Sequence, residues 1–81
     1  MMYMLQLQNR DVSSYAGLYI DVTEIEAVTP LVISTPDKDK AVGATIYTKS
    51  GKVWNVHQSV SEVLDMISDY NEYINKGTTN G

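Results

Sequence analysis

The residue types that most often carry out catalysis are scarce in this sequence. His57 is the only histidine, and Ser59 lies two residues after it. A serine nucleophile needs a histidine base that is itself held in place by a third group. Ser59 has a better explanation, because Glu62 follows it at the spacing of a capping box, in which the two residues cap the start of a helix. We therefore expect no catalytic residue and interpret His57 as a solvated histidine at the end of a strand.

Sites for metals, phosphates or acid–base catalysis are not indicated either. The chain has no cysteine, which excludes disulfides and thiolate metal sites, and one histidine cannot build a zinc site without several carboxylates around it. Pairs such as Glu24 with Glu26 and Asp65 with Asp69 have the spacing of a solvated strand or helix face. No glycine-rich phosphate loop occurs. The sequence thus predicts a protein that is not an enzyme and that carries no metal and no cofactor.

Size and charge narrow the classes of function further. The 81 residues make one domain, and their net charge of −4 disfavours direct binding to DNA or RNA polymers, which requires a basic surface. No apolar run approaches the roughly 18 residues of a membrane span, and the N-terminus lacks the basic and apolar regions of a signal peptide. We therefore expect a cytoplasmic protein with no membrane contact. Small domains without disulfides or metals are often stabilised by association, so we also expect a homo-oligomer.

The spacing of apolar residues predicts five strands followed by one helix. Apolar and polar side chains alternate in short segments separated by turn-forming residues, as in half-buried strands. The expected elements of the single domain 1–81 are strands at about 2–8, 17–22, 24–33, 43–49 and 52–57, a helix at 59–75 and a tail at 77–81. We therefore predict an α+β fold, in which a small antiparallel β-sheet of four to five strands carries one C-terminal amphipathic helix packed on one face.

The firmest part of this pattern is the hairpin and helix from Ala44 to Ile74. Ser50 and Gly51 suit a two-residue turn between strands. Pairing across that turn brings four side chains close together: Tyr47, Lys49, Lys52 and Trp54. After the capping box, apolar residues at helical spacing form one stripe: Val60, Val63, Leu64, Ile67, Tyr70 and Ile74. Gly77 is expected to end the helix.

Residues 30–42 are harder to assign. They contain the apolar run Leu31-Val32-Ile33 and two prolines. The segment either extends the third strand, with residues 35–40 as an exposed turn, or forms an arm that packs on a neighbouring subunit. Pro36 excludes a central strand through that point.

The short stretch between the second and third strands is expected to bend. Residues 21–24 contain Asp and Thr, whose side chains compete for backbone hydrogen bonds. A helical turn at 23–27 is disfavoured by the β-branched residues in it.

Part of the chain resembles a known family. The sequences GATIYTKSGKVWNV at 43–56 and HQSVSEV at 57–63 give a strand, a polar turn with glycine, a strand ending in valine and a helix start. Together with YIDVTEIEAV at 19–28, they resemble the small FlbD-type family of flagellar and swarming motility proteins. Similar small proteins also occur among phage and mobile-element genes. The resemblance implies a hairpin followed by a capped helix, and it specifies no chemistry.

Binding is the class of function that remains. Tyr19 and Tyr47 are expected to point away from the sheet face that buries Leu18, Ile20 and Ile46. Exposed tyrosines are common in protein interfaces. We therefore expect a small non-enzymatic binding protein, a phage or mobile-element accessory that acts by protein–protein interaction as an adaptor or inhibitor of a host factor.

A second class of ligand stays open, namely a signalling nucleotide held between the subunits of an oligomeric anti-defence protein. Trp54 and tyrosines could stack on a nucleobase, and basic side chains could hold its phosphates. The candidate binding residues, for either a host protein or a small nucleotide, are Arg10, Tyr19, Tyr47, Lys49, Lys52 and Trp54.

Overall fold

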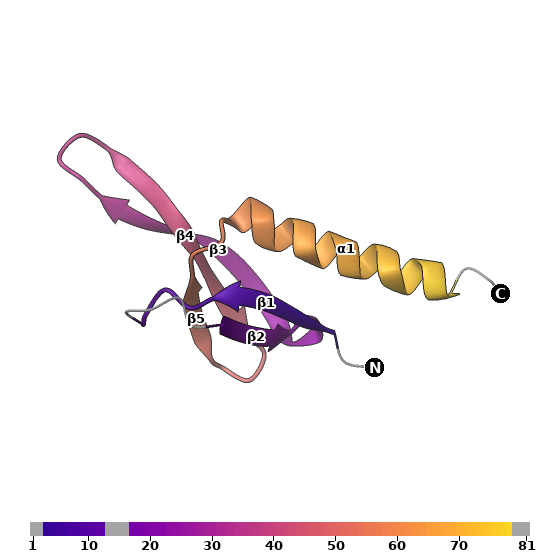
Figure 1. The fold of residues 1–81 in the computed structure, drawn as a ribbon. Coiled ribbons are helices and arrows are strands. Elements are labelled where there is room, and N and C mark those ends of the chain that lie inside the picture. The colour runs from indigo at the N-terminus through magenta and orange to yellow at the C-terminus, as the bar shows by residue number, and fades with distance from the viewer. Residues whose placement is uncertain (1–2, 13–16, 79–81) are drawn as a thin grey trace.

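The computed structural model describes residues 3–12 and 17–78, with side chains up to residue 75. Within these ranges, five strands and a short 3₁₀ helix precede one long α-helix (Figure 1). The elements in chain order are β1 (Met4–Gln8), β2 (Gly17–Asp21), η1 (Val22–Glu24), β3 (Ile25–Ser34), β4 (Asp39–Thr48), β5 (Val53–Val56) and α1 (Val60–Thr78). The predicted α+β class is confirmed. The helix continues through Gly77, past its predicted end, while the predicted strand start at residue 2 and residues 79–81 of the predicted tail lie outside the described residues.

The strands form two antiparallel sheets, so the predicted single sheet of four to five strands is not confirmed. β1 pairs with β2, and β4 lies between β3 and β5 in a three-stranded sheet. The sheets meet where the chain continues beyond β1 along the edge of β5. There, the backbone N–H of Arg10 donates to the carbonyl oxygen of Asn55 at 2.8 Å, and that of His57 donates to Gln8 at 3.0 Å. This contact is short, and it joins the sheets at one edge without merging them.

The chain turns between β2 and β3 through η1. The Asp21 carboxylate accepts hydrogen bonds from the backbone N–H of Thr23 at 3.0 Å and from its hydroxyl at 2.8 Å. The predicted bend at 21–24 is therefore confirmed. It takes a helical form, although β-branched residues argued against one, because a side-chain cap stabilises the first turn.

The core lies between the two sheets and under the helix. Its buried apolar side chains come from both sheets, η1 and α1: Leu5, Leu7, Ile20, Val22, Ala44, Ile46, Val56 and Val63. The ring of Tyr3 packs on that of Tyr70 in α1, with centroids 5.0 Å apart. Leu64 and Ile74, which the sequence placed in the apolar stripe of the helix, are exposed, and Met66 packs on the core instead.

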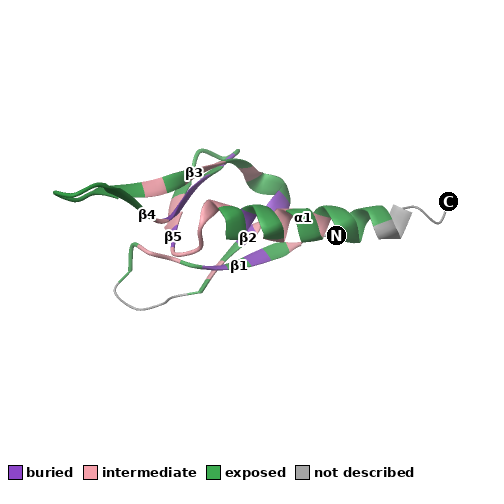
Figure 2. Cartoon of the chain, turned by 90° about the horizontal axis from the view of Figure 1, so that it is seen from above, coloured by how far each residue is buried: buried purple, intermediate pink, exposed green. Residues whose placement is uncertain are grey.

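Residues 30–42 form the outer part of a long hairpin, which matches the first of the two alternatives from the sequence. β3 continues to Ser34 and β4 begins at Asp39 rather than at residue 43, so Pro36 lies in the tip. We call residues 31–42 the arm. The arm and the far end of α1 project from opposite ends of a molecule that measures 56 × 22 × 22 Å (Figure 1). Most of the arm is exposed (Figure 2).

Candidate functional site

The turn between β4 and β5 is one residue longer than predicted. The backbone N–H of Thr48 donates to the carbonyl oxygen of Lys52 at 2.9 Å, and that of Gly51 donates to Thr48 at 3.0 Å, which encloses a loop at 49–51. Gly51 has a φ of 90°, a left-handed conformation that glycine adopts without strain. This combination is a three-residue hairpin loop with a glycine bulge, and it replaces the predicted two-residue turn.

The extra loop residue decides which face of the sheet carries Trp54. Tyr47 lies directly opposite Val53, and Ile46 lies opposite Trp54. Residues opposite each other share a face, and a shift of one residue moves each side chain to the other face. Because Ile46 is buried, Trp54 packs against the core and is partly buried. The predicted grouping of Trp54 with Tyr47 on one outer surface is therefore wrong.

A row of exposed side chains runs across the outer face of the three-stranded sheet. Ala27 of β3, Tyr47 of β4 and Val53 of β5 are cross-strand neighbours. We call these three residues the outer row; Tyr47 and Val53 in it are 38% and 55% exposed. Lys49 and Lys52 lie exposed in the adjoining turn. An aromatic and apolar centre beside a charged margin is the composition of many protein-binding surfaces.

Arg10 is held in place by other parts of the chain. Its Nη1 donates to the carbonyl oxygen of Val42 at 3.3 Å and lies 3.4 Å from Nδ1 of His57. A guanidinium group has only donors, so Nδ1 of His57 can only accept in this contact. Val42 lies at a β-bulge, because the register of β3 against β4 shifts between Leu31 and Val32. Arg10 thus ties the chain beyond β1 to the base of the arm.

The six candidate residues do not form one site within a single chain. Val42, which binds Arg10, is seven residues from Lys49 along β4 and its turn, a span of roughly 20 Å in an extended chain. Tyr19 lies on the other sheet and is 57% exposed. In one copy, therefore, Arg10 does not share an anion-binding surface with Lys49 and Lys52.

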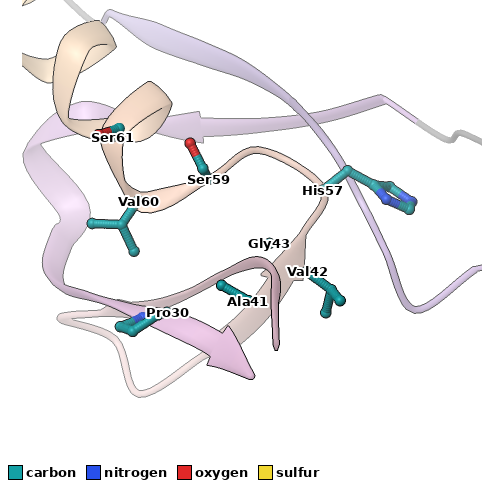
Figure 3. Close-up of a pocket in the computed structure, with 8 residues that line it drawn as sticks. All are labelled: Pro30, Ala41, Val42, Gly43, His57, Ser59, Val60 and Ser61. Atoms are coloured by element: carbon teal, nitrogen blue, oxygen red, sulfur yellow. The ribbon is translucent and has the colours of Figure 1, made fainter. Parts of the chain in front are cut away.

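An open groove between the base of the arm and the start of α1 was missed by the sequence analysis (Figure 3). The groove is lined by four apolar residues, two serines, a glycine and a histidine: Pro30, Ala41, Val42, Val60, Ser59, Ser61, Gly43 and His57. Val60 points from the start of α1 toward Pro30, whereas the ring of His57 points away from Val60 (Figure 3). His57 is half-buried rather than solvated as predicted. No sequence pattern marks the groove, because its two sides are far apart in the chain.

The start of α1, beside this groove, is closed by its own cap. The backbone N–H of Glu62 donates to Oγ of Ser59 at 3.1 Å, and that of Ser59 donates to Oε1 of Glu62 at 3.0 Å. The predicted capping box is confirmed. The carboxylate of Glu62 already supplies the negative charge that a helix N-terminus attracts. The groove therefore suits an apolar group better than a phosphate.

Known proteins give no guide to the ligand of this chain. No protein-family model, curated protein or solved structure matches it. The resemblance to the FlbD-type family therefore stays a prediction from the sequence. Among residues 3–12 and 17–78, no group of three histidine or carboxylate side chains could hold a metal ion. No helix in these ranges has the length and apolar character needed to cross a membrane.

Proposed function

We propose that this chain is a small non-enzymatic binding protein of the cytoplasm, a phage or mobile-element accessory that binds a host protein as an adaptor or inhibitor. The observation that carries the proposal is the outer row, in which Tyr47 and Val53 are 38% and 55% exposed. The phage or mobile-element origin rests on the family resemblance of residues 19–28 and 43–63. The proposed protein is also a homo-oligomer, because a domain of 81 residues without disulfides often needs association for stability.

The outer row has physical features that favour protein binding. Tyr47 offers a large aromatic surface and a hydroxyl group with few rotatable bonds, as residues that dominate interface energies often do. Val53 extends the apolar area that a partner would remove from water. Both side chains stand on paired strands, so binding orders little additional backbone. Lys49 and Lys52 give this edge of an acidic chain a local positive charge, which favours acidic groups on the partner.

Sequestration of a signalling nucleotide has less support from the positions of its candidate residues. Trp54 lies on the core side of the sheet, where a nucleobase could not stack on its full face. The guanidinium group of Arg10 is already bound to Val42 and His57. A nucleotide site would therefore need a second copy to bring the basic groups together.

A pull-down experiment tests the outer row as the partner surface. The wild-type protein and the double variant Tyr47→Glu/Val53→Glu would be immobilised and exposed to lysate of the host cell. Tyr19→Glu is the matched control, because Tyr19 is an exposed tyrosine on the other sheet. We expect a host protein that the wild type and the control retain and the double variant loses. Retention by all three proteins, or by none, would contradict the proposed surface.

A titration separates the two classes of ligand. The protein would be mixed with a panel of cyclic dinucleotides and oligonucleotides while its melting temperature is followed. A ligand at 100 times its dissociation constant stabilises a protein by about 2.7 kcal/mol, which for a domain of this size raises the melting temperature by roughly 10 °C or more. We expect no shift with any nucleotide. A shift of that size would favour the sequestration function over host-protein binding.

A further inference from the structure

The outer edge of β3 is an unpaired strand edge. β3 forms one side of the three-stranded sheet over its whole length. β5 pairs with β4 only from Ala44 to Tyr47, so the arm beyond it is a ribbon of two strands. In the part of the chain that the structure describes, no further strand pairs with this ribbon. Two-stranded ribbons are marginally stable in water by themselves, and an added strand would stabilise the arm.

The side chains of this edge are apolar on both faces of the ribbon. Val32 is 48% exposed and Ile33 is 45% exposed, and neighbouring residues of a strand point to opposite faces. If the arm packed back onto the rest of the chain, it could therefore bury Val32 or Ile33 but not both side chains. From Glu26 to its end at Ser34, β3 carries no further charged residue, although charged residues are one of the common protections of strand edges in monomeric proteins. The composition is that of a strand edge covered by another strand.

The backbone of the arm has free hydrogen-bonding groups at defined positions. The N–H of Thr35 donates to the carbonyl oxygen of Lys38 at 3.0 Å, which closes the tip. Along an antiparallel strand, the backbone N–H and C=O groups of one residue point toward the paired strand, and those of the next residue point away from it. Thr35 points toward β4, and so does every second residue before it. The backbone groups of Ile33 therefore point toward β4, and those of Val32 and Ser34 point to the open side.

Two prolines limit the part of the edge that can pair. Pro30 and Pro36 have no N–H to donate to a neighbouring strand, and Ile33 lies midway between them. The segment that can pair is thus symmetric about Ile33. A strand that runs antiparallel with the same sequence would place its own Val32 opposite Ser34 and its own Ile33 opposite Ile33. Each Val32–Ser34 pair can exchange both backbone hydrogen bonds.

The charge of the arm permits a second copy of this chain to occupy the edge. The tip carries alternating charges that sum to zero, Asp37, Lys38, Asp39 and Lys40. Two arms can therefore approach without net repulsion. The helix is different, since α1 carries four acidic residues against one lysine: Glu62, Asp65, Asp69, Glu72 and Lys76. Like copies would repel each other helix to helix.

From these observations we infer that two copies of the chain pair through the β3 edges of their arms, antiparallel about a two-fold axis at Ile33. The inference deepens the proposed self-association and rests on it. Such an interface is isologous, with the same residues contributed by both copies. It joins two three-stranded sheets into one continuous sheet, by the same addition of a strand that many peptide-binding proteins use.

Charge substitutions at Ile33 test this arrangement, because directly opposed like charges destabilise strand pairing. The molar mass of each protein would be measured by size-exclusion chromatography with light scattering across a range of concentrations. We expect a wild-type dimer and, for Ile33→Lys, a dissociation constant raised at least roughly tenfold. Ile33→Glu should weaken the dimer less, because Lys40 lies beside residue 33 on β4 and partly offsets the added charge. Mixing the two variants should restore a dimer that contains one chain of each, which native mass spectrometry can identify.

A control substitution separates the arm from the outer row. Val53→Lys introduces the same charge at a valine of similar exposure, 55%, on the other surface, and should leave the dimer intact. Circular dichroism would verify that each variant is folded. A monomeric wild type would overturn both the pairing and the proposed self-association. A dimer that survives both Ile33 variants, or that Val53→Lys dissociates, would overturn the arm pairing alone. A monomeric wild type whose captured host protein is lost with Ile33→Lys would show that the edge accepts a partner's strand instead of a second copy.

Discussion

A Cβ atom added to Gly43 would lie 2.1 Å from the carbonyl oxygen of Val56. β4 and β5 thus approach each other at this point more closely than any side chain permits. Gly43 comes directly after the bulge at Val42 and pairs with Leu31 at the base of the arm. Because Gly43 has no side chain, β5 can pack beside β4 against the core at the point where the arm projects away from the core.

Replacing Gly43 with alanine should therefore destabilise the protein strongly. The atom that blocks the new methyl group belongs to the backbone, so a strand must move, and we expect the free energy of unfolding to fall by about 3 kcal/mol or more. Urea unfolding followed by circular dichroism measures the loss. Gly17→Ala is the control, because the atoms nearest to its Cβ would belong to the flexible side chain of Tyr19, the first of them at 3.5 Å, and it should change the stability by less than about 0.5 kcal/mol. Equal losses in both variants would contradict the close approach.

The sequence predicted the parts of this fold that depend on short-range patterns. The capping box formed by Ser59 and Glu62 needs residues only three positions apart, and it is present. The alternation that buries Ile46 and exposes Tyr47 is equally local. Both features follow from chemistry within a single element, so neither requires knowledge of the rest of the chain.

Features that depend on distant pairing were predicted less well. The side of the sheet that carries Trp54 depends on the length of the turn, and an error of one residue reversed it. The strands form two sheets and not one because the sheets are joined by a short contact alone, between residues far apart in the sequence such as Arg10 and Asn55. The groove under Val60 arises in the same way, where the helix start meets the arm. For the candidate site, the sequence identified the exposed Tyr47 but wrongly grouped it with Trp54.

The pairing of Ile46 with Trp54 can be tested with the tryptophan as its own probe. Ile46→Ala removes the side chain next to the indole ring on the core side. We expect a red shift of the fluorescence emission, greater quenching by acrylamide and a loss of about 2–5 kcal/mol in stability. Ile46→Val is the milder variant for use if the alanine variant does not fold.

Tyr47→Ala provides the comparison for this experiment. Tyr47 would contact Trp54 under the two-residue turn, but it lies opposite Val53 in the structure. Its removal should leave the emission maximum of Trp54 unchanged. A red shift with Tyr47→Ala, and none with the Ile46 variants, would mean that the register is the one predicted from the sequence.

Arg10 is expected to act as a structural residue. Arg10→Met keeps much of the aliphatic stem but removes the donor to the carbonyl oxygen of Val42, and we expect a loss of about 1–2 kcal/mol in the free energy of unfolding. Lys49→Met, in the exposed turn, is the matched control and should change stability by less than about 0.5 kcal/mol. Equilibrium urea unfolding without added ligand measures both. Unchanged stability with Arg10→Met would mean that the fold does not need the guanidinium group of Arg10, which would then be available to bind an anion.

The capping box should contribute measurably to stability through both of its hydrogen bonds. Ser59→Ala removes the acceptor of the N–H of Glu62 and should lower the free energy of unfolding by about 1 kcal/mol. Glu62→Ala removes the acceptor of the N–H of Ser59, and the double variant should lose less than the sum of the two, because each residue positions the other. Ser68→Ala is the control on the exposed face of α1, where alanine's helix propensity makes the change neutral or slightly stabilising. Strictly additive losses would mean that the two caps act independently, and a loss with Ser68→Ala equal to that with Ser59→Ala would assign the effect to helix propensity and not to capping.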